Sequence, residues 1–569
     1  MDYIYNITEE EAKRRVDSEY LVAINMLDAS SPQYMALDDN EKKVVYHLCR
    51  AAFWLDKVNY KLQNAHNLDF YHYVQAKANS GDEYSKNVLR LFLAQKSINS
   101  LDTNGDYINL AKGILDNPGK NFYHFDIPKE EFIAHVKDMA DKGMWNDLSK
   151  ILSARTVVDL VDGKLIATDY VEYFAEEFNN CATELINASK YCDDDKFQEY
   201  LIVQSKALQS ADVNLDATAD MLWAKLTGRL EFTITRESYE DELTTAVFAD
   251  EKLAKQLADH GIEVNPKDSI GARIGIVNED GTRLLNTLQS LNNIACNLMP
   301  YNSEYSMPEV NSNPDQVALD VDLITLTGDS GAYRAGIVLA ENLPNSDKLA
   351  IQLGGGRRNI YHRQVRNTKP SDTYKKLIHP EYIKYFNIEA SHWATIEHEN
   401  THSLGPKDIK ALGEYANILE EYKADMGMYS FLRQYVAQGV FSDEQAKQII
   451  VTELFASFLK AKPQLSQAHR VRSVMITNRL LIEGGIVFDN DVLSFNFDKV
   501  IDTCATMLSE VIRLQLDKSV AKAKAYVDKY FVWTDTHDKI ANIIKANSKR
   551  LNGEVVAPIY NEATKDLDI

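Results

Sequence analysis

The sequence predicts an α+β protein whose helices and strands occupy different stretches of the chain. Residues 1–220 show the periodicity of amphipathic helices, with few glycines and many tyrosines and phenylalanines. Residues 229–368 change to alternating apolar and polar side chains separated by turn sequences, which is typical of strands. Helical periodicity returns at about residue 380 and continues to Phe531. Runs of helices around a separate β-rich stretch indicate an α+β architecture.

The length of the chain, 569 residues, predicts two or more domains. We divide it into a helical N-terminal region (1–228), a β-rich region (229–368), a second helical region (369–540) and a C-terminal segment (541–569). The sequence has only 13 prolines and no low-complexity stretch, so no flexible linker is indicated and the domains are expected to pack against one another.

Individual elements follow from the spacing of apolar residues. Helices are predicted over Glu41–Leu62, Glu83–Ser97 and Thr168–Ser189. Strands are predicted over Leu230–Thr235, Val317–Thr327, Tyr333–Leu339 and Lys348–Leu353.

The composition describes a globular protein and argues against several classes of function. Apolar residues make up 45% of the chain and charged residues 26%, which allows a large core. The net charge of −22 argues against nucleic-acid binding, because phosphate neutralisation needs a basic surface. No signal peptide or uninterrupted apolar stretch of about 18 residues is present, so no membrane segment is expected. Five scattered cysteines indicate reduced thiols in a cytoplasmic protein.

The most informative motif is His398-Glu399-Asn400-Thr401-His402, an HExxH pattern. On a helix, His398 and His402 are four residues apart, so both imidazoles project from one face and can bind one Zn²⁺ ion. Glu399 is then held beside the metal, where it can take a proton from zinc-bound water. The alternative is a surface helix with two ordinary histidines. The helix is expected to end soon after His402, because Gly405-Pro406 follows.

A second helix, expected to begin near Asp408, is predicted to supply the third ligand. Glu421 lies on its polar stripe and would leave a fourth metal position for water, as catalytic zinc sites do. Asp425 shares that stripe and could accept the free ring N–H of a ligand histidine, with an exposed charge as the alternative. Glu420 could orient a ligand or bind substrate, and a solvated charge is equally compatible with its position.

These two segments resemble the dipeptidyl peptidase III family of zinc metallopeptidases. The resemblance is carried by residues 393–406 and by Leu419-Glu420-Glu421-Tyr422-Lys423-Ala424-Asp425. The family usually has one more residue between its histidines (HExxGH), and the form found here is similar to its shorter bacterial branch. The matches extend over about residues 230–480.

The same resemblance implies roles for five further residues. Glu237 and Tyr239, in Glu237-Ser238-Tyr239, match a strand segment that binds the substrate amino terminus and bonds near the scissile bond. The Gly-Pro that precedes this segment in the family is Thr235-Arg236 here. Asn342 and Asn345 match an Asn-x-Pro-Asn turn that holds the same amino terminus, a plain turn being the alternative. His469 matches a histidine that stabilises the tetrahedral intermediate, and a structural histidine is the alternative.

The resemblance also implies a two-lobed fold with a wide cleft between the lobes. One lobe is mainly helical and carries zinc, and the other contains a five-stranded β-barrel plus helices. The β-rich region 229–368 would form the lower lobe, with part of 257–315 in the upper lobe. Peptides would bind by adding a strand to the edge of the barrel.

The sequence therefore predicts a zinc-dependent metallopeptidase with one Zn²⁺ per chain, held by His398, His402 and Glu421, with Glu399 as general base. The substrate residues implied by the resemblance predict an exopeptidase that releases dipeptides from the N-terminus of short peptides. A thermolysin-like endopeptidase and a non-catalytic peptide-binding protein of the same fold are the alternatives. Peptides are the expected partners, and the oligomeric state stays open.

Overall fold

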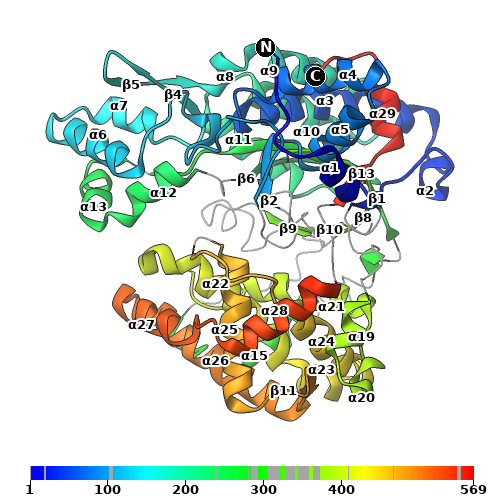
Figure 1. Ribbon diagram of the computed structural model, residues 1–569, viewed down its shortest axis with the longest axis vertical. Helices are drawn as coiled ribbons and strands as arrows, with labels where there is room; N and C mark the ends of the chain where they lie inside the picture. Colours follow the sequence, from blue (N-terminus) through cyan, green and yellow to red (C-terminus); the bar gives the residue numbers. More distant parts are fainter. Residues whose placement is uncertain are drawn as a thin grey trace. The chain divides into compact units, whose positions relative to one another are not determined.

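The structure, a computed structural model, folds into two compact units (Figure 1). Unit 1 comprises Met1–Val277, Val321–Val338 and Arg550–Ile569, and unit 2 comprises Asn278–Asp320 and Leu339–Lys549. The structure describes residues 2–17, 21–101, 107–237, 241–262, 264–279, 281–283, 292–305, 319–328, 340–343, 358–362, 372–407, 409–465, 467–547 and 553–569.

Unit 1 is mainly helical, and its long helix α3 has a strong start signal. The Asp38 side chain accepts hydrogen bonds from the backbone N–H groups of Asn40 and Glu41, and the Glu41 carboxylate accepts from the Asp38 N–H. This reciprocal capping satisfies donors that a helix start leaves free. The helices of unit 1 are α1 (Glu9–Arg15), α2 (Pro32–Met35), α3 (Asp39–Gln63), α4 (Asn67–Asn79), α5 (Glu83–Gln95), α6 (Lys129–Asp141), α7 (Trp145–Ile151), α8 (Tyr170–Tyr173), α9 (Ala175–Ser189), α10 (Asp195–Leu208), α11 (Val213–Trp223), α12 (Glu242–Ala249), α13 (Glu251–Asp259) and α29 (Pro558–Thr564), with a 3₁₀ turn at Lys120–Phe122.

Two of the three predicted helices, α3 and α5, form with nearly the expected bounds. The third prediction, Thr168–Ser189, is wrong at its start. Thr168 and Asp169 end strand β5 (Lys164–Asp169), which pairs with β4 (Thr156–Val161) in an antiparallel hairpin. The Asp169 side chain then caps the short helix α8, and a break at Phe174 separates α8 from α9.

Strands from both ends of the sequence meet in unit 1. Strand β1 (Val22–Asn25) pairs in parallel with β13 (Gly553–Val556), so the C-terminal elements drawn in red lie beside the N-terminal elements drawn in blue (Figure 1). A second small pair joins β2 (Asn99–Leu101) to β3 (Tyr107–Asn109).

The largest sheet has five strands in the order β6-β7-β8-β10-β9. Strands β6 (Leu230–Glu237) and β7 (Ser269–Val277) are antiparallel, with Leu230 opposite Ile276 and Glu237 opposite Ser269. β7 pairs with β8 (Leu319–Leu326) through a register shift, and β9 (Ala340–Leu343) pairs with β10 (Arg358–His362). The predicted strands at 230–235 and 317–327 are thus confirmed as β6 and β8, whereas those at 333–339 and 348–353 lie outside the described residues.

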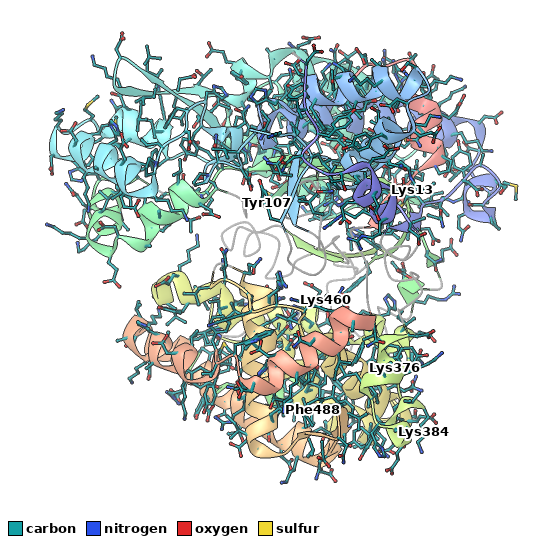
Figure 2. The ribbon with its side chains drawn as sticks, viewed as in Figure 1. Lys13, Tyr107, Lys376, Lys384, Lys460 and Phe488 are labelled. Atoms are coloured by element: carbon teal, nitrogen blue, oxygen red, sulfur yellow. The ribbon has the colours of Figure 1, made fainter. Side chains whose placement is uncertain are left out.

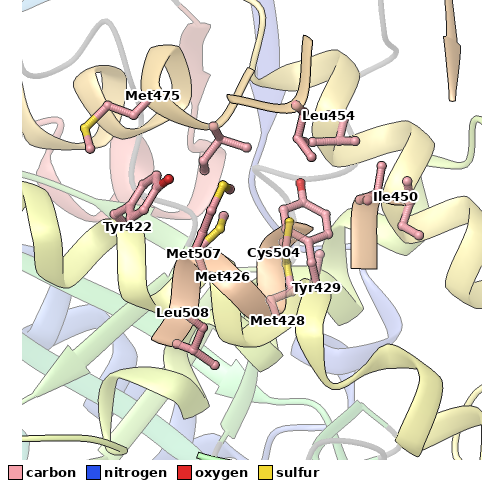
Figure 3. Close-up of a cluster of buried hydrophobic side chains, with 14 of the residues drawn as sticks. Tyr422, Met426, Met428, Tyr429, Ile450, Leu454, Met475, Cys504, Met507 and Leu508 are labelled. Atoms are coloured by element: carbon pink, nitrogen blue, oxygen red, sulfur yellow. The ribbon is translucent and has the colours of Figure 1, made fainter. Parts of the chain in front are cut away.

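Unit 2 is built around helix α22, which packs against α21, α25 and α26. Its buried residues Tyr422, Met426 and Tyr429 form a core with Met475 of α25 and Met507 of α26 (Figure 3). This core holds α22 in a fixed position, because buried apolar side chains of this size pack at crystal-like density. Besides β9 and β10, the described elements of unit 2 are α15 (Asn292–Leu298), α19 (Thr373–Leu377), α20 (Pro380–Ile383), α21 (Ile388–His402), a 3₁₀ helix (Lys410–Tyr415), α22 (Ala416–Ser430), α23 (Leu432–Ala437), α24 (Asp443–Ala456), α25 (Ala468–Glu483), β11 (Ile486–Asp489), β12 (Val492–Phe495), α26 (Phe497–Asp517), α27 (Val520–Tyr530) and α28 (Asp535–Asn547).

Within the described ranges, no helix is both long enough and apolar enough to cross a lipid bilayer.

Candidate metal centre

Helix α21 carries the HExxH motif in its last turn. The Asn387 side chain accepts a hydrogen bond from the Glu389 N–H and so caps the start of the helix. The helix ends at His402, and Gly405 follows with a φ of +89°, as the Gly-Pro pair predicts. His398 and His402 project from one face, with ring centroids 4.7 Å apart and side chains 10% and 13% exposed.

Helix α22 supplies the third residue, Glu421. The expected start near Asp408, a residue outside the described part, is wrong for the α-helix itself. Residues Lys410–Tyr415 form a 3₁₀ helix, and α22 begins at Ala416. The physical reason is Gly413, whose φ of +59° is incompatible with a continuous right-handed helix.

Three potential ligand atoms meet between α21 and α22. The Nε2 atoms of His398 and His402 are 3.1 Å apart. The Glu421 carboxylate oxygens lie 3.3 Å from Nε2 of His398 and 3.7 Å from Nε2 of His402. Atoms at the corners of a tetrahedron with bonds of about 2.0–2.1 Å are separated by about 3.3–3.4 Å. The observed distances scatter around this separation, and the three side chains form a group that could hold one metal ion.

The other nitrogen of each ring is bonded to a carboxylate. Nδ1 of His398 lies 2.7 Å from Asp425, and Nδ1 of His402 lies 3.0 Å from Glu420. A carboxylate accepts but does not donate, so each Nδ1 carries the ring proton and each Nε2 presents a lone pair. These two lone pairs and the Glu421 carboxylate converge on one point. The Oε2 atom of Glu421 also lies 2.9 Å from Nδ1 of His469. A cation satisfies all three acceptors at once.

Two cations, the half-buried Arg472 and the buried Lys423, hold these carboxylates in turn. Arg472 of α25 forms an ion pair with Asp425. Lys423 of α22 lies 2.7 Å from Glu420, whose second oxygen accepts a hydrogen bond from Gln515 of α26 at 3.0 Å. Each of the two histidines is thus linked through a carboxylate to a cationic side chain.

Sequence reasoning did not find Lys423, Arg472 or Gln515. Lys423 stands three residues after Glu420, a spacing that predicts an ion pair on a helix surface and does not reveal that the pair is buried.

The charges of the site leave room for a divalent cation. Glu399, Glu420, Glu421 and Asp425 supply four negative charges, and Lys423 and Arg472 supply two positive charges. The four carboxylates exceed these two cations by two charges, and a divalent cation would offset that excess. Burial opposes ionisation of Glu420, but Lys423 and His402 outweigh burial and lower its pKa to about 2.

Glu399 lies in α21 between the two histidines and is half-buried. Within the described residues its carboxylate makes no hydrogen bond and no ion pair. A carboxylate without a fixed partner beside the three ligand side chains is available to accept a proton.

His469 opens helix α25 and contacts the same cluster. Its Nδ1 atom lies 2.9 Å from Oε2 of Glu421, and its side chain is 58% exposed. The negative charge of Glu421 raises the pKa of His469. Burial opposes ionisation of Glu421, but His469 and His402 outweigh burial and hold its pKa well below the usual range.

The described residues place the remaining predicted side chains only in part. Glu237 is the last residue of β6, in unit 1. Asn342 lies in strand β9, opposite Asn359, and the rest of the predicted turn, from Pro344 onward, lies outside the described residues. Tyr239 and Asn345 lie outside the described residues. The structure thus brings six predicted residues together within unit 2: His398, Glu399, His402, Glu420, Glu421 and Asp425, with His469 against Glu421.

Known proteins match this chain more completely in structure than in sequence. No protein-family model matches the chain. Nudix hydrolase 3 from Arabidopsis thaliana is 22% identical over 447 residues, which cover 73% of this chain and 54% of that protein. The chain therefore spans about half the length of this curated relative.

Two solved structures match almost the whole chain. DPP III from Caldithrix abyssi has a TM-score of 0.76 and 22% identity, covering 97% of this chain and 100% of that one. Dipeptidyl-peptidase III from Corallococcus sp. strain EGB has a TM-score of 0.77 and 19% identity, covering 99% and 100%. The fold expected from the motif segments is confirmed, and the chain has the dipeptidyl-peptidase III fold.

Proposed function

We propose that the protein is a zinc-dependent metallopeptidase that releases dipeptides from the N-terminus of short peptides. The observation that carries the proposal is the convergence of His398, His402 and Glu421, whose potential ligand atoms all lie within 4.8 Å of one another. The likeness to two structures named dipeptidyl-peptidase III supports a peptidase of that type.

One Zn²⁺ per chain fits these residues. His398, His402 and Glu421 would hold it and leave a fourth position open, which is the mark of a catalytic zinc site. When bound, the ion would supply a Lewis acid that polarises the scissile carbonyl and makes water a stronger acid. Asp425 and Glu420 keep the Nδ1 protons in place, so that both Nε2 lone pairs stay available.

The proton transfers fall to Glu399. Its carboxylate, which makes no hydrogen bond to another described residue, takes a proton from the attacking water and later passes it to the leaving amine. His469 is proposed to donate a hydrogen bond to the oxyanion of the tetrahedral intermediate, since its exposed ring stands beside Glu421. Tyr239 is proposed to bond to the substrate near the scissile bond.

The exopeptidase part of the proposal rests on Glu237, Asn342 and Asn345. A carboxylate and two amide oxygens suit the ammonium group of a peptide N-terminus. Cleavage of a peptide and of its N-acetylated form distinguishes an exopeptidase from an endopeptidase, because an exopeptidase cleaves only the peptide with a free N-terminus. Equal cleavage of both forms would favour a thermolysin-like endopeptidase.

The central test combines metal analysis with turnover. The purified protein is expected to contain one zinc per chain and to hydrolyse short peptides. The Glu399→Ala variant should keep its zinc and lose activity, because it lacks the base but keeps the ligands. Unchanged turnover in this variant would overturn the mechanism. A protein that binds zinc and peptides but hydrolyses no member of a broad peptide library would be a non-catalytic binding protein.

A further inference from the structure

Lys423 is an almost completely buried lysine on the helix that carries Glu421. Its side chain is 1% exposed. The ammonium group lies 2.7 Å from the Glu420 carboxylate and donates a hydrogen bond of 2.5 Å to the backbone carbonyl of Leu404. It also lies 3.5 Å from the backbone carbonyl of His402.

These contacts reach His402 from two sides. Through Glu420, Lys423 acts on the carboxylate that holds the His402 ring at Nδ1. Through the carbonyls of His402 and Leu404, it contacts the backbone where helix α21 ends. The last carbonyls of a helix have no partner within the helix, and terminal turns fray when nothing binds them. A metal-binding side chain on the last residue of a helix, such as His402, therefore depends more on added backbone contacts than a side chain in the middle of a helix.

We propose that Lys423 is a positioning residue of the metal centre, which fixes both the ring and the backbone of His402 so that its Nε2 atom faces that of His398. The inference rests on the proposed function only in requiring that the site binds a divalent cation. Lys423 acts through Glu420 and the end of α21 and does not touch the ion.

Direct measurement of zinc affinity tests this role. In the full-length protein, Lys423→Met removes the charge and keeps the length and apolar stem of the side chain. Competition with a chromophoric chelator should show zinc affinity about 10- to 100-fold weaker, the usual effect of losing a residue that orients a ligand. The visible spectrum of bound Co²⁺ should change as well, because it reports the geometry of the ligands.

Two lysines serve as matched controls. Lys267 in unit 1 is also buried, and its ammonium donates to the carbonyls of Ile151 and Ser153 and to the Thr156 hydroxyl. Lys267→Met should lower stability without changing zinc affinity. Lys376, which projects from α19 (Figure 2), is exposed, and Lys376→Met should change neither quantity.

A double substitution shows whether Lys423 works through Glu420. If it does, Lys423→Met should weaken zinc binding much less in a Glu420→Gln background than in the wild type. If Lys423→Met fails to fold, two other experiments test the role. Gln515→Leu removes another donor to Glu420 and should weaken zinc binding severalfold. Lys423→Arg, which keeps the charge, should bind zinc more tightly than Lys423→Gln.

The outcomes separate the two proposals. Wild-type protein that binds zinc tightly, with Lys423→Met binding it equally well and with an unchanged Co²⁺ spectrum, would overturn the role of Lys423 and leave the metal centre intact. Full additivity of Lys423→Met and Glu420→Gln would overturn the route through Glu420. Wild-type protein that binds no zinc would overturn both proposals.

Discussion

The Nε2 atoms of His398 and His402 face one another at 3.1 Å while a carboxylate holds the Nδ1 atom of each ring. Two lone pairs that point at each other repel, so the arrangement is unfavourable unless a metal ion or a shared proton lies between them.

Removal of metal should therefore lower the stability of the protein. A ligand that binds only the folded state at a thousand times its Kd adds about 4 kcal/mol to the free energy of unfolding. Treatment with a chelator should lower the melting temperature, and added Zn²⁺ should restore it. The His398→Ala variant should melt at one temperature with and without chelator. An unchanged melting temperature of the wild type after complete chelation would contradict a zinc ion at this site.

Asp425→Asn should weaken zinc binding. The asparagine amide can still accept from Nδ1 of His398, but it lacks the negative charge that raises the basicity of the ring and that pairs with Arg472. We expect about 10- to 100-fold weaker zinc affinity by chelator competition. The matched control is Glu414→Gln, which neutralises an exposed carboxylate of the preceding 3₁₀ helix and should leave zinc affinity unchanged.

His469→Ala should separate chemistry from binding. Loss of one oxyanion donor typically costs about 10²–10³ in kcat, whereas the zinc ligands are untouched. Steady-state kinetics should show a lower kcat at similar KM, and metal analysis should show full zinc content. If the variant instead loses zinc, the contact between His469 and Glu421 supports the ligand and not the intermediate.

Gly427→Ala should disturb the metal centre through packing. A Cβ atom at Gly427 would lie 2.4 Å from Cγ2 of Thr401, which is buried in α21 between the two histidines. The helices α21 and α22 must then move apart, at a cost of about 1–3 kcal/mol. Urea unfolding should show this loss together with weaker zinc binding. Asn417→Ala, exposed on the same helix, should show neither effect.

His537 should make unit 2 sensitive to acid. The buried ring accepts a hydrogen bond at Nδ1 from the backbone N–H of Thr534 and bonds through Nε2 to Thr477, so it is neutral when folded. Burial lowers its pKa to about 4, against about 6.5 in the unfolded chain. The unfolded state binds the proton first, so stability is full above pH of about 6.5 and falls towards pH 4, by roughly 3 kcal/mol.

Urea unfolding from pH 7 to pH 4 checks the effect of His537. The wild type should lose more stability over this range than His537→Gln, because the glutamine cannot take up a proton. Parallel pH profiles for the two proteins would contradict the assignment.

The parts of the site that follow from local geometry could be predicted from the sequence. Residues four apart share a helix face. This spacing alone places His398 beside His402, and Glu421 beside Asp425. The burial of Lys423 could not be predicted in this way. It results from tertiary packing, in which the end of α21 and helix α26 lie against the ion pair of Lys423 and Glu420.

The fold shows the same division between local and distant contacts. The hairpin β4–β5 has a recognisable signal that sequence analysis passed over: Asp162-Gly163, with φ values of +49° and +73°, forms the turn that favours Asp-Gly. Strand β13 gives no such signal. Its partner β1 lies more than 500 residues earlier, and no local pattern indicates that pairing.

The parallel pairing of β1 with β13 has a consequence for how the protein is made. Unit 1 begins with the first residues of the chain and ends with the last, whereas unit 2 ends at Lys549. A ribosome therefore delivers every residue of the metal centre before it delivers the strand that completes unit 1. Strand β1 is therefore made more than 500 residues before its partner and stays unpaired while unit 2 is synthesised. Completion of unit 1 thus follows the synthesis of unit 2, and its rate is set by a contact of very long sequence separation.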